Sequence, residues 1–505
     1  MLERNGEALW DPGPGMARKL FGAQRWVNSL AVKDEDDPSK TGPIDDVIPV
    51  GLARSSTIIP GIVSIDGYTE IHGAIVRAFG DKLVEGDPLQ PVTIGESVNL
   101  ACRVDGKDPN AWGVPNYYRF AYDWRRDIRS ASQRLANLID NALPALRQVS
   151  PDAKVVFVTH SMGGLVARYY VEGTNPKTGE PHEGWRNTRQ LLTIGTPHRG
   201  SIDALSKTVN GFRKLFIDLT PTLLSMTSSY QLLPRYRCVL DKRENPSGDW
   251  IYPHEISDIA DFDAARANAS YTDFHAVIDG GVEAHRNEDD YPAYYVQPII
   301  GFGNETNNSA ILDHDGLTLS ASNPKGVPDS FAGGDGTVPQ ISALPPDYWG
   351  PDGDDLVAVR HCNDGHGAMM TNKGLIAREV TQRLRKSQER SDRLAMQPEQ
   401  GVASAIYLSH AAFWTADASG GPTSGDPVSD RSAAELTAQV KGIDDTKIDL
   451  TVMELGRPAV PLIQQTIESG DSLTLRCPPG EYMASASVGG GALETTSRFV
   501  VLEDR

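Results

Sequence analysis

Three residue types that together can carry out covalent ester chemistry occur in a fixed order along the chain. Ser161 lies in the stretch VVFVTHSMGGLVARYYVE (155–172), between a short apolar run and a helical pattern. Asp335 lies in the glycine-rich stretch FAGGDGTVPQIS, and His366 lies in RHCNDGHGAMM. A serine becomes a strong nucleophile when a histidine accepts its proton and a carboxylate orients that histidine. The order serine, acid, histidine is typical of proteins in which the serine stands on a strand-to-helix turn.

The sequence around Ser161 matches only part of the strained turn, G-x-S-x-G, that exposes such a nucleophile. Gly163 supplies the second small residue of the pattern, but Thr159 replaces the first glycine. Ser161 could therefore cap an ordinary helix, and Asp335 could merely stabilise its own turn. Because both partners follow in the required order, we predict Ser161 as nucleophile, Asp335 as orienting acid and His366 as general base.

The loop that contains His366 offers two further interpretations. His361 is a rival general base, although it lies at the end of a predicted strand, where its reach is shorter. His361, Cys362, Asp364 and His366 together could hold a metal, but their spacing fits no zinc pattern, and no second ligand group occurs elsewhere. We therefore expect neither a metal nor a cofactor.

Composition places the chain among globular proteins and argues against one class of partner. Its 505 residues are 39% hydrophobic and 23% charged, which allows one large domain and a smaller one. The net charge of -19 argues against nucleic acid as a partner, because phosphate binding requires clustered lysine and arginine. An anionic membrane surface would also repel the chain on average.

Cysteine usage and the amino-terminal sequence bear on the cellular compartment. The four cysteines are widely spaced and form no CxxC pair, so they indicate neither a zinc ribbon nor a disulfide framework. No run of about 18 apolar residues occurs, and MLERNGEALWDPG lacks the apolar core of a signal peptide. The sequence therefore predicts no transmembrane segment and a cytoplasmic protein.

Short apolar runs alternate with helical patterns between residues 117 and 386, which predicts an α/β fold with a mostly parallel sheet. We expect strands at 117–124, 154–159, 189–195, 293–303 and 355–360, and helices at 130–147, 163–172 and 375–387. Pro298 weakens the fourth strand, because proline cannot donate a hydrogen bond from a central position.

Residues 201–292 form an insertion that is too long for a plain loop, and we expect a cap or lid there. Four apolar residues within it recur at helical spacing before Pro221, which should end the helix: Phe212, Leu215, Phe216 and Leu219. This helix either packs inside the cap or faces lipid as a lid, and in the second case the cap would bring membrane contact.

The character of the sequence changes after a charged stretch that ends near residue 400. Short alternating runs, separated by glycine, proline and serine clusters, predict a small β-sandwich. We expect an α/β domain over 1–390, a helix end and linker over 391–427, and a β-rich carboxy-terminal domain over 428–505.

Six motifs follow one another in a fixed order: FAYDWRRD (120–127), THSMGG (159–164), TIGTPHRGS (193–201), SSYQLLPRY (228–236), GGDGTVP (333–339) and the His366 loop. Together they resemble the lecithin:cholesterol acyltransferase family of α/β-hydrolases, from residue 8 to residue 390. The resemblance implies an α/β-hydrolase fold and assigns the same three catalytic roles.

The resemblance also aligns residues 122–125 with the YDWR segment of the family, near the mouth of the active site. Asp123, Trp124 and Arg125 would either help to position the acyl chain or lid, or form a buried arrangement that holds the loops in place.

A tetrahedral intermediate needs two backbone N–H donors for its oxyanion. One follows the nucleophile, which makes it the N–H of Met162, and the other comes from a loop after an earlier strand. Within the chain the candidate is TIIPGIV (57–63), with Gly61 as the donor. The resemblance instead implies that the oxyanion strand would precede Met1. The sheet would then have an unpaired edge beside the nucleophile strand.

These features predict a serine-dependent acyl-enzyme catalyst that, by the resemblance, acts on lipid esters. With water as the acyl acceptor it would be a lipase, phospholipase or esterase, and with a lipid hydroxyl it would be an O-acyltransferase. Pocket shape and water exclusion select the acceptor, and motifs encode neither. Two other functions stay open: a catalytically impaired lipid-binding or interaction module, and a non-lipid carboxylesterase.

Overall fold

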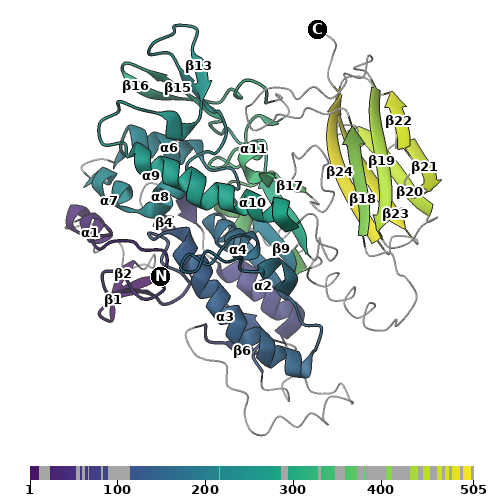
Figure 1. The fold of residues 1–505 in the computed structure, drawn as a ribbon, viewed down its shortest axis with the longest axis horizontal. Helices are drawn as coiled ribbons and strands as arrows, with labels where there is room; N and C mark the ends of the chain where they lie inside the picture. The colour runs from purple at the N-terminus through teal and green to yellow at the C-terminus, as the bar shows by residue number, and fades with distance from the viewer. Residues whose placement is uncertain are drawn as a thin grey trace.

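A parallel sheet of four strands lies at the centre of the α/β part of the computed structural model (Figure 1). Its order is β17-β14-β9-β8, with β8 at Val155–His160, β9 at Thr188–Ile194, β14 at Tyr295–Gly301 and β17 at Arg360–Cys362. The structure describes residues 1–10, 23–52, 57–59, 63–65, 68–80, 83–88, 114–214, 217–285, 294–327, 331–346, 359–371, 380–381, 384, 405–411, 433–441, 447–454, 463–468, 472–476, 480–488 and 493–501.

The sheet forms from the apolar runs that the sequence predicts. β8 reads VVFVTH and β9 reads TRQLLTI, and such β-branched and aliphatic runs are typical of parallel strands that are covered on both faces. Val158 pairs with Leu192, and Leu191 pairs with Val296, so apolar residues continue across the sheet. The strands predicted at 154–159, 189–195 and 293–303 are confirmed.

Two helices, α3 and α4, pack against the sheet beside β8. α3 (Ile128–Val149) begins after Asp127, whose side chain accepts a hydrogen bond from Arg129 N–H at 2.8 Å and caps the helix. α4 (Met162–Glu172) follows β8 directly. Leu135 of α3 and Val166 of α4 belong to one buried apolar cluster with Phe157 of β8. The helices predicted at 130–147 and 163–172 are confirmed.

Two strands differ from the prediction. The strand expected over 117–124 is limited to β7 (Tyr117–Tyr118). The chain turns soon after β7 because the Asp123 side chain accepts hydrogen bonds from the backbone and guanidinium of Arg125. The last strand of the sheet begins only at Arg360, and most of the range predicted for it lies outside the described residues. The helix predicted at 375–387 also lies almost wholly outside them.

Pro298 lies inside the central strand β14, where we expected it to weaken the strand. Gly195 N–H donates to Ile299 O at 2.9 Å, so Ile299 faces β9 and Pro298 faces the other side. Pairing with β17 begins at Ile299, opposite Arg360. The N–H that Pro298 lacks would face β17 just before the residues at which β14 and β17 pair. The missing N–H therefore costs the sheet no hydrogen bond between these two strands.

The segment 201–292 contains several helices and part of a second sheet. Its elements are α6 (Ile202–Val209), β10 (Arg213–Lys214), β11 (Ile217–Asp218), α7 (Thr220–Ser225), α8 (Thr227–Gln231), β12 (Val239–Asp241), β13 (Asp249–Ile251), a 3-10 turn (Pro253–Glu255), α9 (Ala264–Ala269), a π-helical stretch (Ser270–His275) and α10 (Ala276–His285). β12 and β13 join β15 (Ser309–Asp313) and β16 (Gly316–Ser320) in a sheet of order β13-β12-β15-β16. The segment thus shares a sheet with later chain, and its role as a cap or lid stays a prediction.

The helix predicted before Pro221 is wrong. β10 and β11 form a short antiparallel hairpin there, and two of the four apolar positions, Leu215 and Phe216, lie outside the described residues. Pro221 lies in the first turn of α7 instead of ending a helix, because its fixed φ and missing N–H suit that position.

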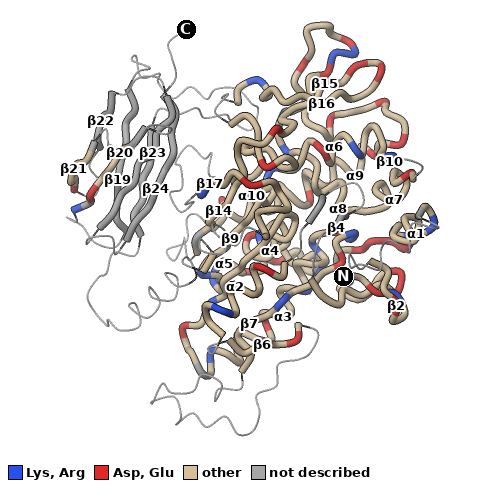
Figure 2. Tube along the Cα trace, turned by 180° about the vertical axis from the view of Figure 1, so that it is seen from behind, with Lys and Arg blue, Asp and Glu red and all other residues tan. Residues whose placement is uncertain are grey.

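The amino-terminal part and the remaining short elements surround this core. They are β1 (Leu2–Arg4), β2 (Glu7–Trp10), α1 (Ala23–Ser29), β3 (Val47–Pro49), β4 (Thr57–Ile59), β5 (Val63–Ile65), α2 (Thr69–Phe79), β6 (Glu85–Gly86), α5 (Gly184–Asn187), α11 (Gln340–Ala343) and a 3-10 turn (Ala368–Met370). β2, β1 and β3 form a small sheet in that order. Figure 2 shows acidic and basic residues interspersed along the described chain.

Seven strands near the carboxy terminus form two antiparallel sheets, which Figure 1 shows gathered in a group of their own. They are β18 (Ala405–Ala411), β19 (Ala433–Lys441), β20 (Lys447–Glu454), β21 (Ile463–Glu468), β22 (Ser472–Arg476), β23 (Gly480–Val488) and β24 (Leu493–Val501). The sheet orders are β18-β19-β22 and β21-β20-β23-β24. The strand-rich composition is as expected, whereas a separate domain with the predicted boundaries stays a prediction. Of the helices described, none has the length and apolar character needed to cross a membrane.

Candidate active site

Ser161 stands on a sharp turn between β8 and α4. Its φ of 52° and ψ of -132° fall outside the regions that residues with a side chain favour. Ser161 N–H donates to Ile194 O at 2.9 Å, and Gly164 N–H donates to Ser161 O at 3.0 Å. Thr159, which replaces the first glycine of the motif, donates its hydroxyl to Leu192 O at 2.9 Å and so fits within the sheet. The turn therefore presents the Ser161 hydroxyl at the carboxyl end of β8.

The second small residue that this turn requires is Gly164, one position later than the motif indicates. A Cβ at Gly164 would lie 2.1 Å from Thr196 Oγ1, which is far inside van der Waals contact. A Cβ at Gly163 would lie 3.7 Å from the Tyr122 hydroxyl oxygen, an ordinary contact distance. The close approach of α4 to the loop after β9 thus depends on Gly164.

His366 bridges Ser161 and Asp335 through hydrogen bonds. Its Nε2 lies 3.0 Å from Ser161 Oγ, and its Nδ1 lies 2.7 Å from Asp335 Oδ2. Because a carboxylate can only accept, Nδ1 carries the proton and Nε2 offers its lone pair to the serine hydroxyl. The structure therefore brings together the three residues that the sequence put forward, in a geometry suited to proton transfer from Oγ to Nε2.

Backbone N–H groups of the glycine-rich turn fix the orientation of the Asp335 carboxylate. Its Oδ1 accepts N–H groups of Thr337 at 2.9 Å and Val338 at 2.7 Å, which leaves Oδ2 for His366. Burial alone would raise the pKa of this carboxyl, but the charge and hydrogen bond of His366 and the two N–H groups together lower the pKa below its ordinary value. Asp335 therefore stabilises its turn and orients His366 at the same time.

His361 and Cys362 lie in β17 rather than at the serine. His361 pairs with Ile300 in the sheet, and its ring is 5.9 Å from the ring of Phe302. Cys362 is buried, and burial raises the pKa of its thiol to about 11. Among the residues that the structure describes, no group of three or more histidine, cysteine or acidic side chains is arranged to hold a metal. The geometry thus favours His366 over His361 as the base.

Asp123, Trp124 and Arg125 form a buried arrangement that links two parts of the chain. The guanidinium of Arg125 donates from Nε and Nη2 to the two carboxylate oxygens of Asp123, at 2.9 and 2.6 Å. Its Nη1 donates to Leu30 O at 3.2 Å, and the Trp124 ring packs edge-on against Trp10. Two roles were considered for this segment. These buried contacts favour the one in which it holds the loops in place, and a role in positioning the acyl chain or lid stays a prediction.

One histidine beside the site had no role in the sequence interpretation. His160 is the last residue of β8, and its ring centroid lies 4.8 Å from that of His366. The available signal was its position directly before the predicted nucleophile. A sequence pattern cannot reveal that its partner is a backbone carbonyl from a distant loop.

Met162 is the first residue of α4, and N–H groups in the first turn of a helix have no partner within the helix. The role of its N–H as one oxyanion donor stays a prediction. Gly61, a candidate for the second donor, lies outside the described residues. The second donor stays a prediction.

A groove follows the edge of β8 that faces away from β9. Of the strands described, β9 is the one that pairs with β8. A cavity of about 480 Å³ runs along the other edge from Lys154 to Gly163, walled by apolar residues of α2 and α3. Because Ser161 N–H faces β9 and successive residues alternate, the backbone groups of Val156, Val158 and His160 are directed to the groove.

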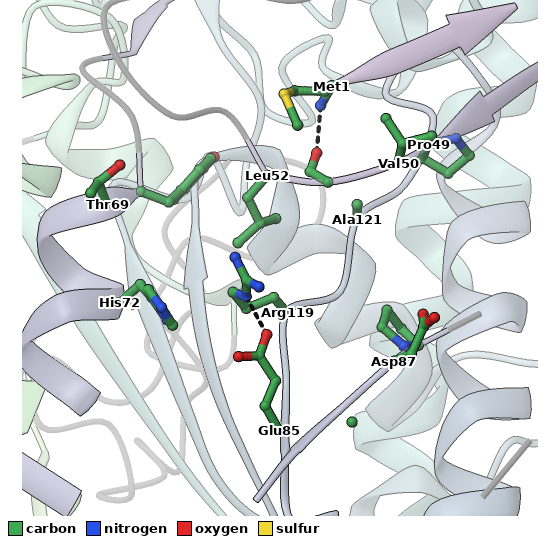
Figure 3. A pocket seen from close by; sticks show the side chains of 14 residues that line it. Met1, Pro49, Val50, Leu52, Thr69, His72, Glu85, Asp87, Arg119 and Ala121 are labelled. Carbon is green, nitrogen blue, oxygen red and sulfur yellow. Dashed lines mark hydrogen bonds and ion pairs between the residues drawn. The ribbon is translucent and has the colours of Figure 1, made fainter. Parts of the chain in front are cut away.

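A second cavity of about 530 Å³ adjoins this groove (Figure 3). The two cavities share Tyr68, His72 and Arg119 among their lining residues. Met1 is one of the lining residues of this second cavity, and its amino group donates to the carbonyl of Gly51. The beginning of the described chain is therefore close to the groove beside the nucleophile strand.

A serine on a strained turn after a parallel strand, joined by hydrogen bonds to a histidine and an aspartate from later loops, is the arrangement of acyl-enzyme hydrolases and acyltransferases with mixed α/β folds. The family model described as lecithin:cholesterol acyltransferase matches residues 112–341. This region, which includes Ser161 and Asp335, is thus similar to the lecithin:cholesterol acyltransferase family.

Comparison with solved structures finds eight similar chains. One of them is the mature form of a Bacillus licheniformis lipase, with 14% sequence identity and a TM-score of 0.27, and the match covers 60% of this chain and 89% of the lipase. No curated protein matches the chain.

Proposed function

We propose that this protein is a serine-dependent catalyst that forms an acyl-enzyme from lipid esters, as an O-acyltransferase or a lipase of the lecithin:cholesterol acyltransferase type. The observation that carries the proposal is the hydrogen-bonded series from Ser161 Oγ through His366 to Asp335. Ser161 makes no side-chain hydrogen bond that caps α4, so its hydroxyl serves His366 rather than the helix. The family match supports the choice of lipid esters.

In the first half-reaction, His366 Nε2 accepts the hydroxyl proton while Ser161 Oγ bonds to the ester carbonyl carbon. The carbonyl oxygen becomes an oxyanion, and the imidazole becomes positively charged. When the carbon bond to the alcohol oxygen breaks, Nε2 returns the proton to that oxygen. Asp335 accepts Nδ1–H throughout and stabilises the charged imidazole. The products are an alcohol and an acyl group bound to Ser161.

In the second half-reaction, an acceptor hydroxyl takes the place of the departed alcohol. His366 Nε2 accepts its proton while its oxygen attacks the acyl carbon, and the proton then passes to Ser161 Oγ as the acyl bond to serine breaks. If the acceptor is water, the product is a fatty acid. If it is a lipid hydroxyl, the product is a new ester.

We further propose that the second oxyanion donor lies at the groove edge of β8, because Ser161 directly follows this strand. The candidate donor within the chain is the N–H of Gly61. Gly61→Pro removes the Gly61 N–H, whereas Gly61→Ala keeps it. A loss on the order of 10² to 10³ in turnover for Gly61→Pro alone would identify Gly61 as the donor, and near-equal rates for the two variants would contradict that assignment.

A fluorescent alkyl phosphonate tests the proposed function, because it reacts covalently with an activated serine. We expect labelling of the full chain and loss of labelling in Ser161→Ala. A folded full chain that is not labelled would contradict the proposal and would favour the alternative of a lipid-binding module. Phospholipid vesicles with and without a long-chain alcohol then separate the two acceptors, through release of fatty acid or formation of a new ester.

A further inference from the structure

His160 connects the nucleophile strand to the loop that carries His366. The His160 side chain is 4% exposed, and its Nε2 lies 3.1 Å from the backbone oxygen of His366. Its Nδ1 lies 3.5 Å from the hydroxyl oxygen of Tyr68, a longer contact. His160 is thus the residue before the nucleophile in sequence and a neighbour of the proposed base in space.

The direction of these hydrogen bonds follows from the chemistry of the partners. A carbonyl oxygen can only accept, so His160 Nε2 carries a proton and donates it to His366 O. Burial lowers the pKa of His160 to about 3, so the ring is neutral and Nδ1 is an acceptor. Burial also raises the pKa of Tyr68 to about 12, which keeps its hydroxyl available as the donor.

The backbone of His366 is consequently held on both sides. Its N–H donates to Asp335 O at 2.8 Å, and its carbonyl accepts from His160. Without the His160 contact, His366 itself would keep the hydrogen bond of its N–H and those of its imidazole, and its carbonyl would lose this donor. A shift of about 1 Å between reacting groups can cost on the order of 10² in rate.

We propose that His160 is a positioning residue that sets the distance between His366 Nε2 and Ser161 Oγ through its hydrogen bond to the His366 carbonyl. This inference rests on the proposed function, since it concerns the rate of proton transfer at the same site. His160 touches neither reacting atom, so its effect should appear in kcat more than in KM.

Three substitutions of His160 test the role of the donor. The side-chain nitrogen of glutamine can take the place of Nε2, whereas the shorter asparagine cannot reach the carbonyl, and leucine has no donor. We expect His160→Gln to keep most of the kcat of the full chain on a short p-nitrophenyl ester. His160→Asn and His160→Leu should each lower kcat by on the order of 10² with little change in KM.

The outcomes separate this inference from the proposed function. If the parent chain neither turns over ester nor reacts with the phosphonate, the proposed function fails. If the parent is active and His160→Asn matches His160→Gln in kcat, positioning through the donor is wrong. Should His160→Leu fail to fold, the comparison between glutamine and asparagine still decides, since both are polar amides. An unfolding midpoint for each variant shows that the compared chains are folded.

Discussion

A single imidazole makes both hydrogen bonds on which the proposed chemistry depends. His366 needs its Nδ1 proton held by Asp335 so that Nε2 is free to accept from Ser161. The depressed pKa of Asp335 keeps the carboxyl ionised, and an ionised carboxyl stabilises the imidazolium. In the proposed mechanism, each of the three side chains depends on the other two.

Loss of any member of this group should therefore remove most of the activity. We expect Ser161→Ala, His366→Ala and Asp335→Asn each to abolish most turnover of a short p-nitrophenyl ester. A variant with both serine and histidine replaced should be scarcely slower than Ser161→Ala, because residues that act as a unit are not additive. His361→Ala is the matched control and should stay active. If it were as damaging as His366→Ala, the assignment of the base would be wrong.

Asp335→Asn should also show a distinct response to pH. The asparagine amide stays neutral at every pH, so at no pH in the neutral range should the rate of this variant reach that of the parent chain. A rate within a few-fold of the parent at the same pH would contradict the role given to Asp335.

At this scale the sequence predicted the residues whose partners are side chains with recognisable chemistry. Ser161, Asp335 and His366 could be found because their types and order are restricted by the reaction. His160 could not, because its partner is a backbone carbonyl that any residue would supply. Gly164 was missed for a similar reason, since the Thr196 side chain that restricts it comes from another loop.

The helix that follows the nucleophile depends on close contact with its neighbouring loop. Gly164→Ala would place a Cβ 2.1 Å from Thr196 Oγ1 and force α4 or that loop to move. We expect a loss of about 1 to 3 kcal/mol in the free energy of unfolding, as for other overpacked sites. Urea unfolding measures this loss.

Gly163→Ala is the matched control for this experiment. Its Cβ would make an ordinary contact at 3.7 Å, and alanine favours the helix by up to about 1 kcal/mol over glycine. We therefore expect equal or greater stability. If Gly163→Ala were the more damaging of the two, the restriction at the turn would lie where the motif places it.

Elements with long, regular patterns were predictable, and those set by local turns were not. The 22-residue helix α3 and the apolar strands β8 and β9 follow directly from periodicity and composition. The sequence from Phe212 to Leu219 has apolar residues at helical spacing, so spacing alone indicated a helix where the structure has β10 and β11. The strand predicted over 117–124 was longer than the observed β7, because a turn formed by the Asp123 side chain ends the extended region.

Buried histidines should make the stability of the whole molecule depend on pH. Burial lowers the pKa of His160 and of His275 to about 3, whereas an unfolded histidine has a pKa near about 6.5. Between these values the unfolded chain binds more protons than the folded chain, so the free energy of unfolding falls as the pH falls. At pH 5 each group should reduce it by up to about 2 kcal/mol.

Urea midpoints at pH 7 and pH 5, at constant ionic strength, measure this dependence. His275→Gln provides a control, because the amide can still donate to Gln231 O, which His275 Nε2 contacts at 3.0 Å, but does not titrate. The difference between the two pH values should be smaller in this variant. A midpoint that stayed the same or rose at pH 5 in the parent chain would contradict the expectation.

The groove beside β8 means that the strand carrying the nucleophile is also the edge of its sheet among the described strands. In deuterium oxide, the amide protons of Val156 and Val158, which face the groove, should exchange faster than those of Phe157 and Thr159, which face β9. Equal protection along β8 would mean that another segment already covers this edge. Any polypeptide that pairs with β8 would slow exchange at the two valines, so isotope exchange in two residues reports whether the sheet is closed beside the serine.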